Sequence, residues 1–394
     1  MADETPPDTT CPEDKEYCDS DSFAVDACGH SFTFYPSGQD RLDALIEHIE
    51  KAERMLDVFY YMFQDDRSGH KVRDALVEAA KRGVAVRLVI DDFGSDAPIE
   101  FFDPLTDAGG KFAVFSADWN VRYLVRNHQK FAIADNARVM TGGSNVSDHY
   151  YNPPEDNGWC DLGVLIEGDI AKKFTEWFEL IHDWASSDGS QFRRIRDMIR
   201  EWDPGEGDVQ LLMGGPFIRR AHWAYQFKAD LARAKQLDTV TAYFGPPRSF
   251  RRAFAKVAKR GKARMITAGK SDIEGTIFVA RLFYRRLMRA GARIFEFQPC
   301  KLHMKLLVVD DISYFGSANL DRRSIRINIE LMVRVKDKAL AERLRKFMDH
   351  LQEATVTADD EWYRKHSNFW HRMRWRLYHW LSIADYRLAR AATA

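Results

Sequence analysis

The feature that most constrains the fold is an internal repeat spaced by roughly 175–182 residues. The run AKRG at 80–83 precedes VAVRLVI, and AKRG at 258–261 precedes KARMIT. LTDAGGKFAVF at 105–115 matches LMRAGARIFEF at 287–297, and HQK at 128–130 matches HMK at 303–305. The offsets are 258 − 80 = 178, 287 − 105 = 182 and 303 − 128 = 175. Three matched landmarks in one order indicate a duplicated domain.

Helical and strand patterns alternate within the repeat. Residues 41–54 and 71–82 have helical spacing of apolar side chains, whereas 55–63 and 84–90 have strand patterns. A chain of 394 residues also exceeds one ordinary core. The sequence therefore predicts an α/β fold made of two pseudo-symmetric α/β/α sandwich halves, with mixed, largely parallel sheets and one shared site at their interface.

Composition changes along the chain suggest where the parts begin and end. The C-terminal segment is rich in Trp and Arg, and the N-terminal segment is acidic. The predicted parts are an acidic mobile tail at 1–30, a first half at 31–185, a connector at 186–208, a second half at 209–353, and a basic aromatic helix at 354–394.

Charge, apolar runs and cysteines exclude several classes of protein. A net charge of −1 argues against a globally basic nucleic-acid binder. No apolar run approaches the roughly 20 residues that span a bilayer, and the N-terminus lacks the pattern of a signal peptide. The five cysteines include no CxxC pair, so we expect free thiols in a reducing cytoplasm rather than a disulfide framework or a zinc site.

Each half carries the pattern His-x-Lys-x4-Asp followed by a turn of Gly, Ser and Asn: NHQKFAIAD then TGGSN, and LHMKLLVVD then FGSAN. In a strand, residues two apart share a face and odd separations fall on opposite faces. His303 and Lys305 therefore share one face, and Asp310 lies on the other. By the same reasoning, Asp135 and Asp310 are predicted to be structural anchors that bind backbone amides or a basic side chain.

The predicted site face combines two imidazoles, His128 and His303, with two ammonium groups, Lys130 and Lys305. Convergent donors and positive charge suit a phosphate group. Turn residues that could bind it are Asn145, Ser317, Asn319 and Gly143, although the asparagines could instead cap turns. The sequence contains neither a carboxylate cluster for magnesium nor a P-loop, so no metal or cofactor is expected and a histidine would be the nucleophile.

Two histidines can divide the chemistry. One would attack phosphorus, while the other would protonate the leaving alcohol and then deprotonate the incoming alcohol or water. Each imidazole needs a carboxylate behind it to fix its tautomer. The candidates are Glu330 and Asp161, at 330 − 303 = 27 and 161 − 128 = 33 residues after the motif histidine of their own half. Ordinary surface or ion-pair carboxylates are the alternative.

These motifs resemble the phospholipase D superfamily, in which two such motifs form one site. The run SANLDRRS with the following Asn-Ile-Glu resembles the bacterial cardiolipin synthases, as does GGSN, where Gly143 replaces the serine of the general pattern. The resemblance covers residues 35–351. It implies transfer of a phosphatidyl group between two phosphatidylglycerol molecules, with release of glycerol, through a phosphatidyl-histidine. It further implies that His128 is the nucleophile and His303 the acid and base.

Two other functions remain open at this stage: a hydrolytic phospholipase D and a nuclease of the same superfamily, although no nucleic-acid partner is expected. A peripheral position on the cytoplasmic side of the bacterial membrane is predicted, because the C-terminal segment has an apolar stripe flanked by arginines. Packing of this stripe against the body of the protein is the alternative. Its residues are Trp370, Met373, Leu377, Trp380, Leu381, Ala384 and Leu388.

Overall fold

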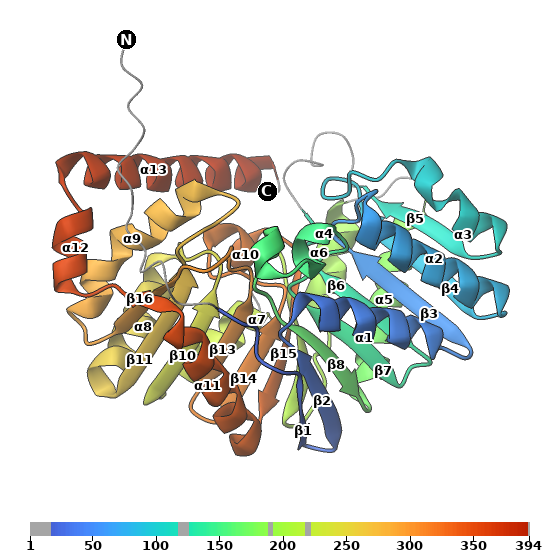
Figure 1. Cartoon of the computed structure of the whole chain (residues 1–394), viewed down its shortest axis with the longest axis horizontal. Coiled ribbons are helices and arrows are strands. Elements are labelled where there is room, and N and C mark those ends of the chain that lie inside the picture. Colours follow the sequence, from blue (N-terminus) through green and yellow to red (C-terminus); the bar gives the residue numbers. More distant parts are fainter. Residues whose placement is uncertain (1–16, 117–125, 188–191, 217–221, 393–394) are drawn as a thin grey trace, which may run out of the picture.

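The computed structural model describes residues 17–116, 126–187, 192–216 and 222–392, and Figure 1 shows two α/β halves side by side. The first half is an eight-stranded sheet with the order β1-β2-β8-β7-β6-β3-β4-β5. Its strands are β1 (Phe23–Ala27), β2 (His30–Tyr35), β3 (Met55–Tyr60), β4 (Ala85–Asp91), β5 (Lys111–Phe115), β6 (Lys130–Ala134), β7 (Arg138–Gly142) and β8 (Gly163–Glu167). Its helices are α1 (Gly38–Glu50), α2 (Arg67–Lys81), α3 (Asp103–Asp107), α4 (Asp148–Tyr151) and α5 (Ile170–Ala185), with 3-10 turns at Ile99–Phe102 and Pro154–Asp156.

Helix α6 (Phe192–Glu201) leads to the second sheet, whose order is β16-β12-β11-β10-β13-β14-β15-β9. Its strands are β9 (Val209–Gly214), β10 (Gln236–Thr241), β11 (Lys262–Ala268), β12 (Arg293–Phe297), β13 (Lys305–Val309), β14 (Ile312–Gly316), β15 (Glu330–Lys336) and β16 (Thr355–Thr357). The remaining helices are α7 (Trp223–Leu231), α8 (Arg248–Arg260), α9 (Glu274–Met288), α10 (Arg322–Arg326), α11 (Lys338–Glu353), α12 (Asp360–His366) and α13 (Phe369–Ala392).

The two sheets share one topology, which confirms the two-half α/β prediction and fits an internal duplication. The order β5-β4-β3-β6-β7-β8-β2 in the first half corresponds to β12-β11-β10-β13-β14-β15-β9 in the second. Parallel pairing is confined to β3-β4-β5 and β10-β11-β12, and the other neighbours pair antiparallel. This parallel share is smaller than the helix–strand alternation predicts, because tight hairpins such as β6–β7 need no helical crossover.

The outer boundaries differ from the expected ones. Within residues 17–30, part of the predicted tail, β1 pairs with β2, and Phe23 stacks on Phe34 at 5.0 Å between ring centroids. Residues 354–394 are not one helix, because β16 pairs with β12 and α12 precedes α13. A boundary read from charge missed both edge strands, because β1 and β16 have only five and three residues and lie next to charged segments.

The motif strands lie in the core that the halves share. Every residue of β6 (KFAIA) and β13 (KLLVV) is buried. Phe32 and Phe34 of β2 pack edge-on against Phe315 of β14, with ring centroids 6.0 and 5.5 Å apart. This joint core holds the two motifs against each other. In the part of the chain that the structure describes, no helix is both long and apolar enough to cross a bilayer.

Candidate active site

Short backbone bridges between the halves position the two motif histidines. His128 N–H donates to Ile329 O at 2.8 Å, and Ile329 N–H donates to Arg126 O at 2.9 Å. The second histidine repeats the arrangement, because His303 N–H donates to Cys160 O at 2.8 Å. Each histidine thus lies beside the residue that precedes a carboxylate of the other half, Glu330 or Asp161.

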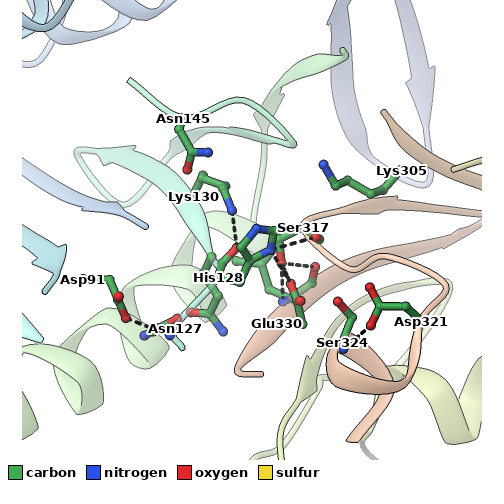
Figure 2. A network of polar contacts seen from close by, with 12 residues as sticks. Asp91, Asn127, His128, Lys130, Asn145, Lys305, Ser317, Asp321, Ser324 and Glu330 are labelled. Atoms are coloured by element: carbon green, nitrogen blue, oxygen red, sulfur yellow. Dashed lines mark hydrogen bonds and ion pairs between the residues drawn. The ribbon is translucent and has the colours of Figure 1, made fainter. Parts of the chain in front are cut away.

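The carboxylate partners of the two imidazoles are therefore exchanged between the halves. His128 Nδ1 lies 3.2 Å from Glu330 Oε2, and His303 Nδ1 lies 2.8 Å from Asp161 Oδ2. Both carboxylate side chains are fully buried. Figure 2 shows Glu330 directed at His128. The sequence spacing related each carboxylate to the histidine of its own half, whereas in the structure each carboxylate contacts the histidine of the other half.

Both motif lysines lie on the histidine face, as the strand alternation predicts. Lys130 Nζ donates to His128 O at 2.5 Å and lies 5.0 Å from the centre of the Tyr61 ring. Lys305 Nζ lies 2.7 and 3.0 Å from the two ring nitrogens of His303. Both ammonium groups are buried. Burial lowers the pKa of Lys305 to about 8 and that of Lys130 well below its usual value, so an anion bound near the two amines would favour their charged forms.

Both imidazoles are held neutral in the ligand-free protein. Burial, reinforced by Lys305, lowers the pKa of His303 to about 4. Burial also lowers the pKa of His128 well below its usual value, with further contributions from Lys130 and Lys305. If the Nδ1 proton of neutral His128 is directed at Glu330, Nε2 carries the lone pair that a nucleophile needs.

The two carboxylates have opposite shifts. Burial raises the pKa of Glu330 to about 7, although Lys130 and Ser317 oppose the rise. Burial also acts to raise the pKa of Asp161, but Lys305 and His303 outweigh it and hold that pKa below its usual range. Asp161 therefore stays ionised at neutral pH, whereas Glu330 exchanges a proton near neutrality.

Two of the predicted phosphate-binding side chains are engaged with the protein. Asn145 Oδ1 accepts from Met62 N–H at 3.3 Å, and its Nδ2 donates to Tyr150 Oη at 2.7 Å. The Ser317 hydroxyl donates to Glu330 Oε2 at 2.5 Å, so it braces the carboxylate. Asn145 and Asn319 both line the cavity, and the buried Oδ1 of Asn319 has no hydrogen-bond partner among the described atoms.

Gly143 occupies the position of Ser317 in the first half, and the structure gives a steric reason for glycine there. A Cβ at this position would lie 2.3 Å from Asp161 Oδ1. The absent side chain therefore makes room for the carboxylate behind His303. Its N–H faces Leu162 O at 3.4 Å rather than the cavity, which differs from the predicted phosphate contact.

Asp135 and Asp310 lie away from the imidazoles and bind backbone amides. Asp135 accepts from the N–H groups of Glu53, Arg54 and Met55 at 3.0, 2.8 and 3.1 Å. Asp310 accepts from those of Lys235 and Gln236 at 3.0 and 2.8 Å. Both aspartates adopt left-handed backbone conformations, with φ of 57° and 49°. They fix the start of β3 and β10, the strands that pair with the two motif strands.

Replacing Asp310 with alanine is expected to lower the free energy of unfolding by about 2–3 kcal/mol, because two backbone donors lose their acceptor and alanine disfavours positive φ. Asp310→Asn is the matched control, since asparagine keeps an acceptor and tolerates this backbone conformation. Denaturant unfolding would measure both. Loss of catalysis in a folded Asp310→Ala protein would contradict the anchoring role.

A single cavity of about 600 Å³ is lined by both imidazoles and by side chains of both halves. Part of its wall comes from α13, through Tyr378, Leu381, Ser382 and Asp385. Several lining residues were not predicted from sequence: Tyr61, Arg126, Tyr150, Trp159, Tyr243 and Asp272. A signal existed for two of them, because Tyr61 and Tyr243 follow the ends of β3 and β10, and these strands pair with the motif strands.

Asp91 is a further buried carboxylate that the sequence reasoning did not single out. Burial raises its pKa to about 7. It accepts from Asn127 N–H at 2.8 Å, immediately before His128, as Figure 2 shows. Asp91 thus holds the backbone in place at the residue immediately before His128. Within the described ranges, no trio of His, Cys, Asp or Glu side chains is arranged to hold a metal ion.

Comparison with known proteins now identifies the family. A family model described as "Cardiolipin synthase, PLD-like domain" matches residues 45–184 and 228–352, one segment in each half. The chain belongs to this family. Cardiolipin synthase A of Pseudomonas putida (strain GB-1) is 31% identical over 337 residues, which cover 82% of this chain and 69% of that protein.

A second relative in the family, cardiolipin synthase 2 of Bacillus anthracis, is 27% identical over 341 residues, covering 84% of this chain and 66% of that protein. The chain thus spans about two thirds of the length of these relatives. Among solved structures, phosphatidylserine synthase of Haemophilus influenzae Rd KW20 superposes with a TM-score of 0.73 at 14% identity, over 92% of this chain and 95% of that one. That likeness supports the fold alone.

Proposed function

We propose that this chain is a phosphatidyltransferase that forms cardiolipin from two phosphatidylglycerol molecules and releases glycerol. The observation that carries the proposal is the crossed pairing of His128 with Glu330 and of His303 with Asp161 around one cavity. Two neutral imidazoles, each with a carboxylate on Nδ1, suit one nucleophile and one acid–base group. Family membership supports the lipid substrate.

In the first step, His128 Nε2 attacks the phosphorus of one phosphatidylglycerol, and the bond from phosphorus to the glycerol oxygen breaks. His303 gives its proton to that oxygen, and glycerol leaves. In the second step, His303 takes the proton of a hydroxyl on the second phosphatidylglycerol. The new P–O bond forms, the P–N bond breaks, and its electron pair returns to His128.

The first step requires protonated His303, although the empty pocket lowers its pKa. The positive charge of Lys305 contributes to the lowered pKa of His303. A phosphodiester bound between Lys130 and Lys305 would add negative charge that offsets this contribution. Substrate binding is therefore expected to raise the pKa of His303 and charge it when a proton is needed. The same anion would draw Lys305 Nζ away from the His303 ring.

Purified protein mixed with phosphatidylglycerol vesicles tests the proposal. We expect cardiolipin and free glycerol in equal amounts. Phosphatidic acid as the main product would instead indicate a hydrolytic phospholipase D. No lipid product, together with cleavage of single-stranded DNA, would indicate a nuclease and contradict the proposal.

We further infer that α13 binds the surface of an anionic membrane. The predicted stripe lies largely on the exposed side of the helix, with Trp370 72% and Trp380 63% exposed. Buried Trp375 and Tyr386 face the protein, and in Figure 1 α13 lies along α9. Exposed arginines flank the stripe, so the surface suits lipid headgroups with negative charge. They include Arg372, Arg376 and Arg387.

The position of α13 connects this surface with the cavity. Leu381 belongs to the exposed stripe and also lines the cavity. A lipid bound under α13 would therefore have its headgroup close to the cavity. The described cysteines, Cys18, Cys28, Cys160 and Cys300, are unpaired, which supports a peripheral position on the cytoplasmic side of the membrane.

Replacing Trp370 and Trp380 together with serine is expected to weaken binding to phosphatidylglycerol vesicles at least about tenfold, because two exposed indoles no longer enter the interface. Co-sedimentation with vesicles measures the effect. Ile99→Ser is the control, since Ile99 is 63% exposed in the first half, away from α13. Equal binding by the double variant and by Ile99→Ser would exclude α13 as the membrane surface.

A further inference from the structure

A duplicated fold should surround both histidines with equivalent residues. Positions where the two halves differ therefore indicate that the two sides of the cavity bind different parts of the substrates. Three positions after Asn319 stands Arg322, whereas three positions after Asn145 stands Asp148. Because the motif pairs are crossed, the turn from one half approaches the histidine of the other. Arg322 lines the cavity, whereas Asp148 accepts hydrogen bonds from Ser68 and is not among the lining residues.

The side next to His128 is basic. Tyr61 lies 4.8 Å from the His128 ring, and Arg126 is close enough to contribute to the lowered pKa of His128. The Arg126 guanidinium stacks 4.0 Å above the ring of Phe93 and also lines the cavity. Arg323 is close enough to Tyr61 to influence its pKa, and it also pairs with Asp385 at 2.8 Å. This basic side suits the anionic part of a lipid headgroup.

The side next to His303 is aromatic and carries a carboxylate. Tyr150 lies edge-on to the His303 ring at 5.1 Å, and Trp159 lies 5.4 Å from it. The loop between β11 and α9 contributes Asp272, whose Oδ1 accepts from Tyr243 Oη at 2.6 Å. Asp272 and His303 both line the cavity, and each influences the pKa of the other.

Asp272 differs from the carboxylate that orients His303. Asp161 is fully buried behind Nδ1, whereas Asp272 is exposed and lines the cavity. Tyr243 and Ser271 both donate to Oδ1 of Asp272 and hold the carboxylate in place. A fixed carboxylate can accept hydrogen bonds from neighbouring hydroxyls of a polyol, and aromatic rings can pack against its carbon chain.

We propose that Asp272, held by Tyr243, forms with Tyr150 and Trp159 a polyol subsite that selects a glycerol headgroup over a monohydric alcohol or water. This inference rests on the proposed function, in which His303 exchanges a proton with the alcohol that leaves and with the alcohol that enters. Both alcohols therefore pass beside His303. In each case the group in the subsite is a glycerol with a free hydroxyl pair.

Partitioning of the phosphatidyl-enzyme between competing acceptors tests the subsite. The donor is a phosphatidyl ester of p-nitrophenol in phosphatidylcholine vesicles, offered with equal concentrations of glycerol and 1-propanol. We expect Asp272→Ala to lower the ratio of phosphatidylglycerol to phosphatidylpropanol at least about tenfold, because the polyol loses its hydrogen-bond partner. Water competes in the same experiment, so phosphatidic acid is expected to increase.

Two controls separate recognition from other effects. Glu274→Gln removes a nearby carboxylate that does not line the cavity, and its partition ratio should equal that of the wild type. The burst of nitrophenol release from Asp272→Ala should stay within about threefold of the wild type, because this step needs no proton from His303. Loss of the burst would mean that Asp272 supports the attack on phosphorus and would overturn the subsite.

The remaining outcomes separate the two proposals. Normal nitrophenol release with an unchanged acceptor ratio in Asp272→Ala would overturn the subsite and leave the phosphatidyltransferase intact. No phosphatidyl product from the wild type with any acceptor would overturn the proposed function and the subsite together. Tyr243→Phe provides a second variant, and we expect it to lower the ratio in the same direction by loosening the carboxylate.

Discussion

His128→Ala is expected to abolish the phosphatidyl-enzyme and to lower turnover of phosphatidylglycerol at least about 10⁴-fold, because the attacking nitrogen is lost. No other imidazole can replace it, since His303 is held by Asp161 and Lys305. Radiolabelled donor lipid would show the adduct in the wild type and none in the variant. The adduct should be labile in acid and stable in base, as expected of a P–N bond.

A donor with a good leaving group separates the nucleophile from the acid. Nitrophenol leaves without protonation, so His303→Ala should keep a burst of nitrophenol release, whereas His128→Ala should have none. Thermal unfolding of both variants would establish that they are folded. A burst in His128→Ala, but not in His303→Ala, would assign the nucleophile to His303 and reverse the division of labour.

The motif residues could be predicted from sequence because strand geometry is local. Alternation separated Lys305 from Asp310, and in the structure Asp310 lies in the turn after β13, where it binds the backbone amides of Lys235 and Gln236 instead of the imidazole. The repeat likewise predicted two similar α/β halves, since equal patterns fold into equal sheets. Both results depend on residues close together in the chain.

The exchange of carboxylates between halves could not be predicted in this way. It follows from the bridges at Asn127–Ile329 and Cys160–Leu302, which join residues 202 (329 − 127) and 142 (302 − 160) positions apart. No periodicity encodes such a register. The role of Gly143 was hidden for the same reason, because the carboxylate that needs the space reaches it only in the folded protein.

The hydrogen-bond partners that the turn side chains find within the protein could not be predicted from sequence. Ser317 is predicted to bind phosphate, and in the structure its hydroxyl donates a hydrogen bond to the buried carboxylate of Glu330. A carboxylate buried away from water is destabilised unless it accepts hydrogen bonds, whereas a solvated phosphate can accept them from water. The polar turn therefore provides side chains that hold Glu330 in place and side chains that line the cavity. Residue type alone does not show which side chain has which role.

The crossed pairing predicts that two conservative substitutions will slow different steps. Glu330→Gln should slow the burst of nitrophenol release by about 10–100-fold, because glutamine no longer fixes the reactive tautomer of His128. Asp161→Asn should leave that burst within about threefold of the wild type, since its partner is the acid–base histidine. Rapid-mixing measurements of the burst would compare the two.

Unlike the burst of nitrophenol release, turnover of phosphatidylglycerol should be sensitive to Asp161→Asn. Asp161→Asn should lower it by about 10–100-fold, because His303 must protonate glycerol and deprotonate the acceptor. The double variant Glu330→Gln/His128→Ala should be no slower than His128→Ala alone, since the carboxylate acts through that imidazole. If Asp161→Asn removed the burst and Glu330→Gln preserved it, each carboxylate would serve the histidine of its own half, and the exchange between halves would have no part in catalysis.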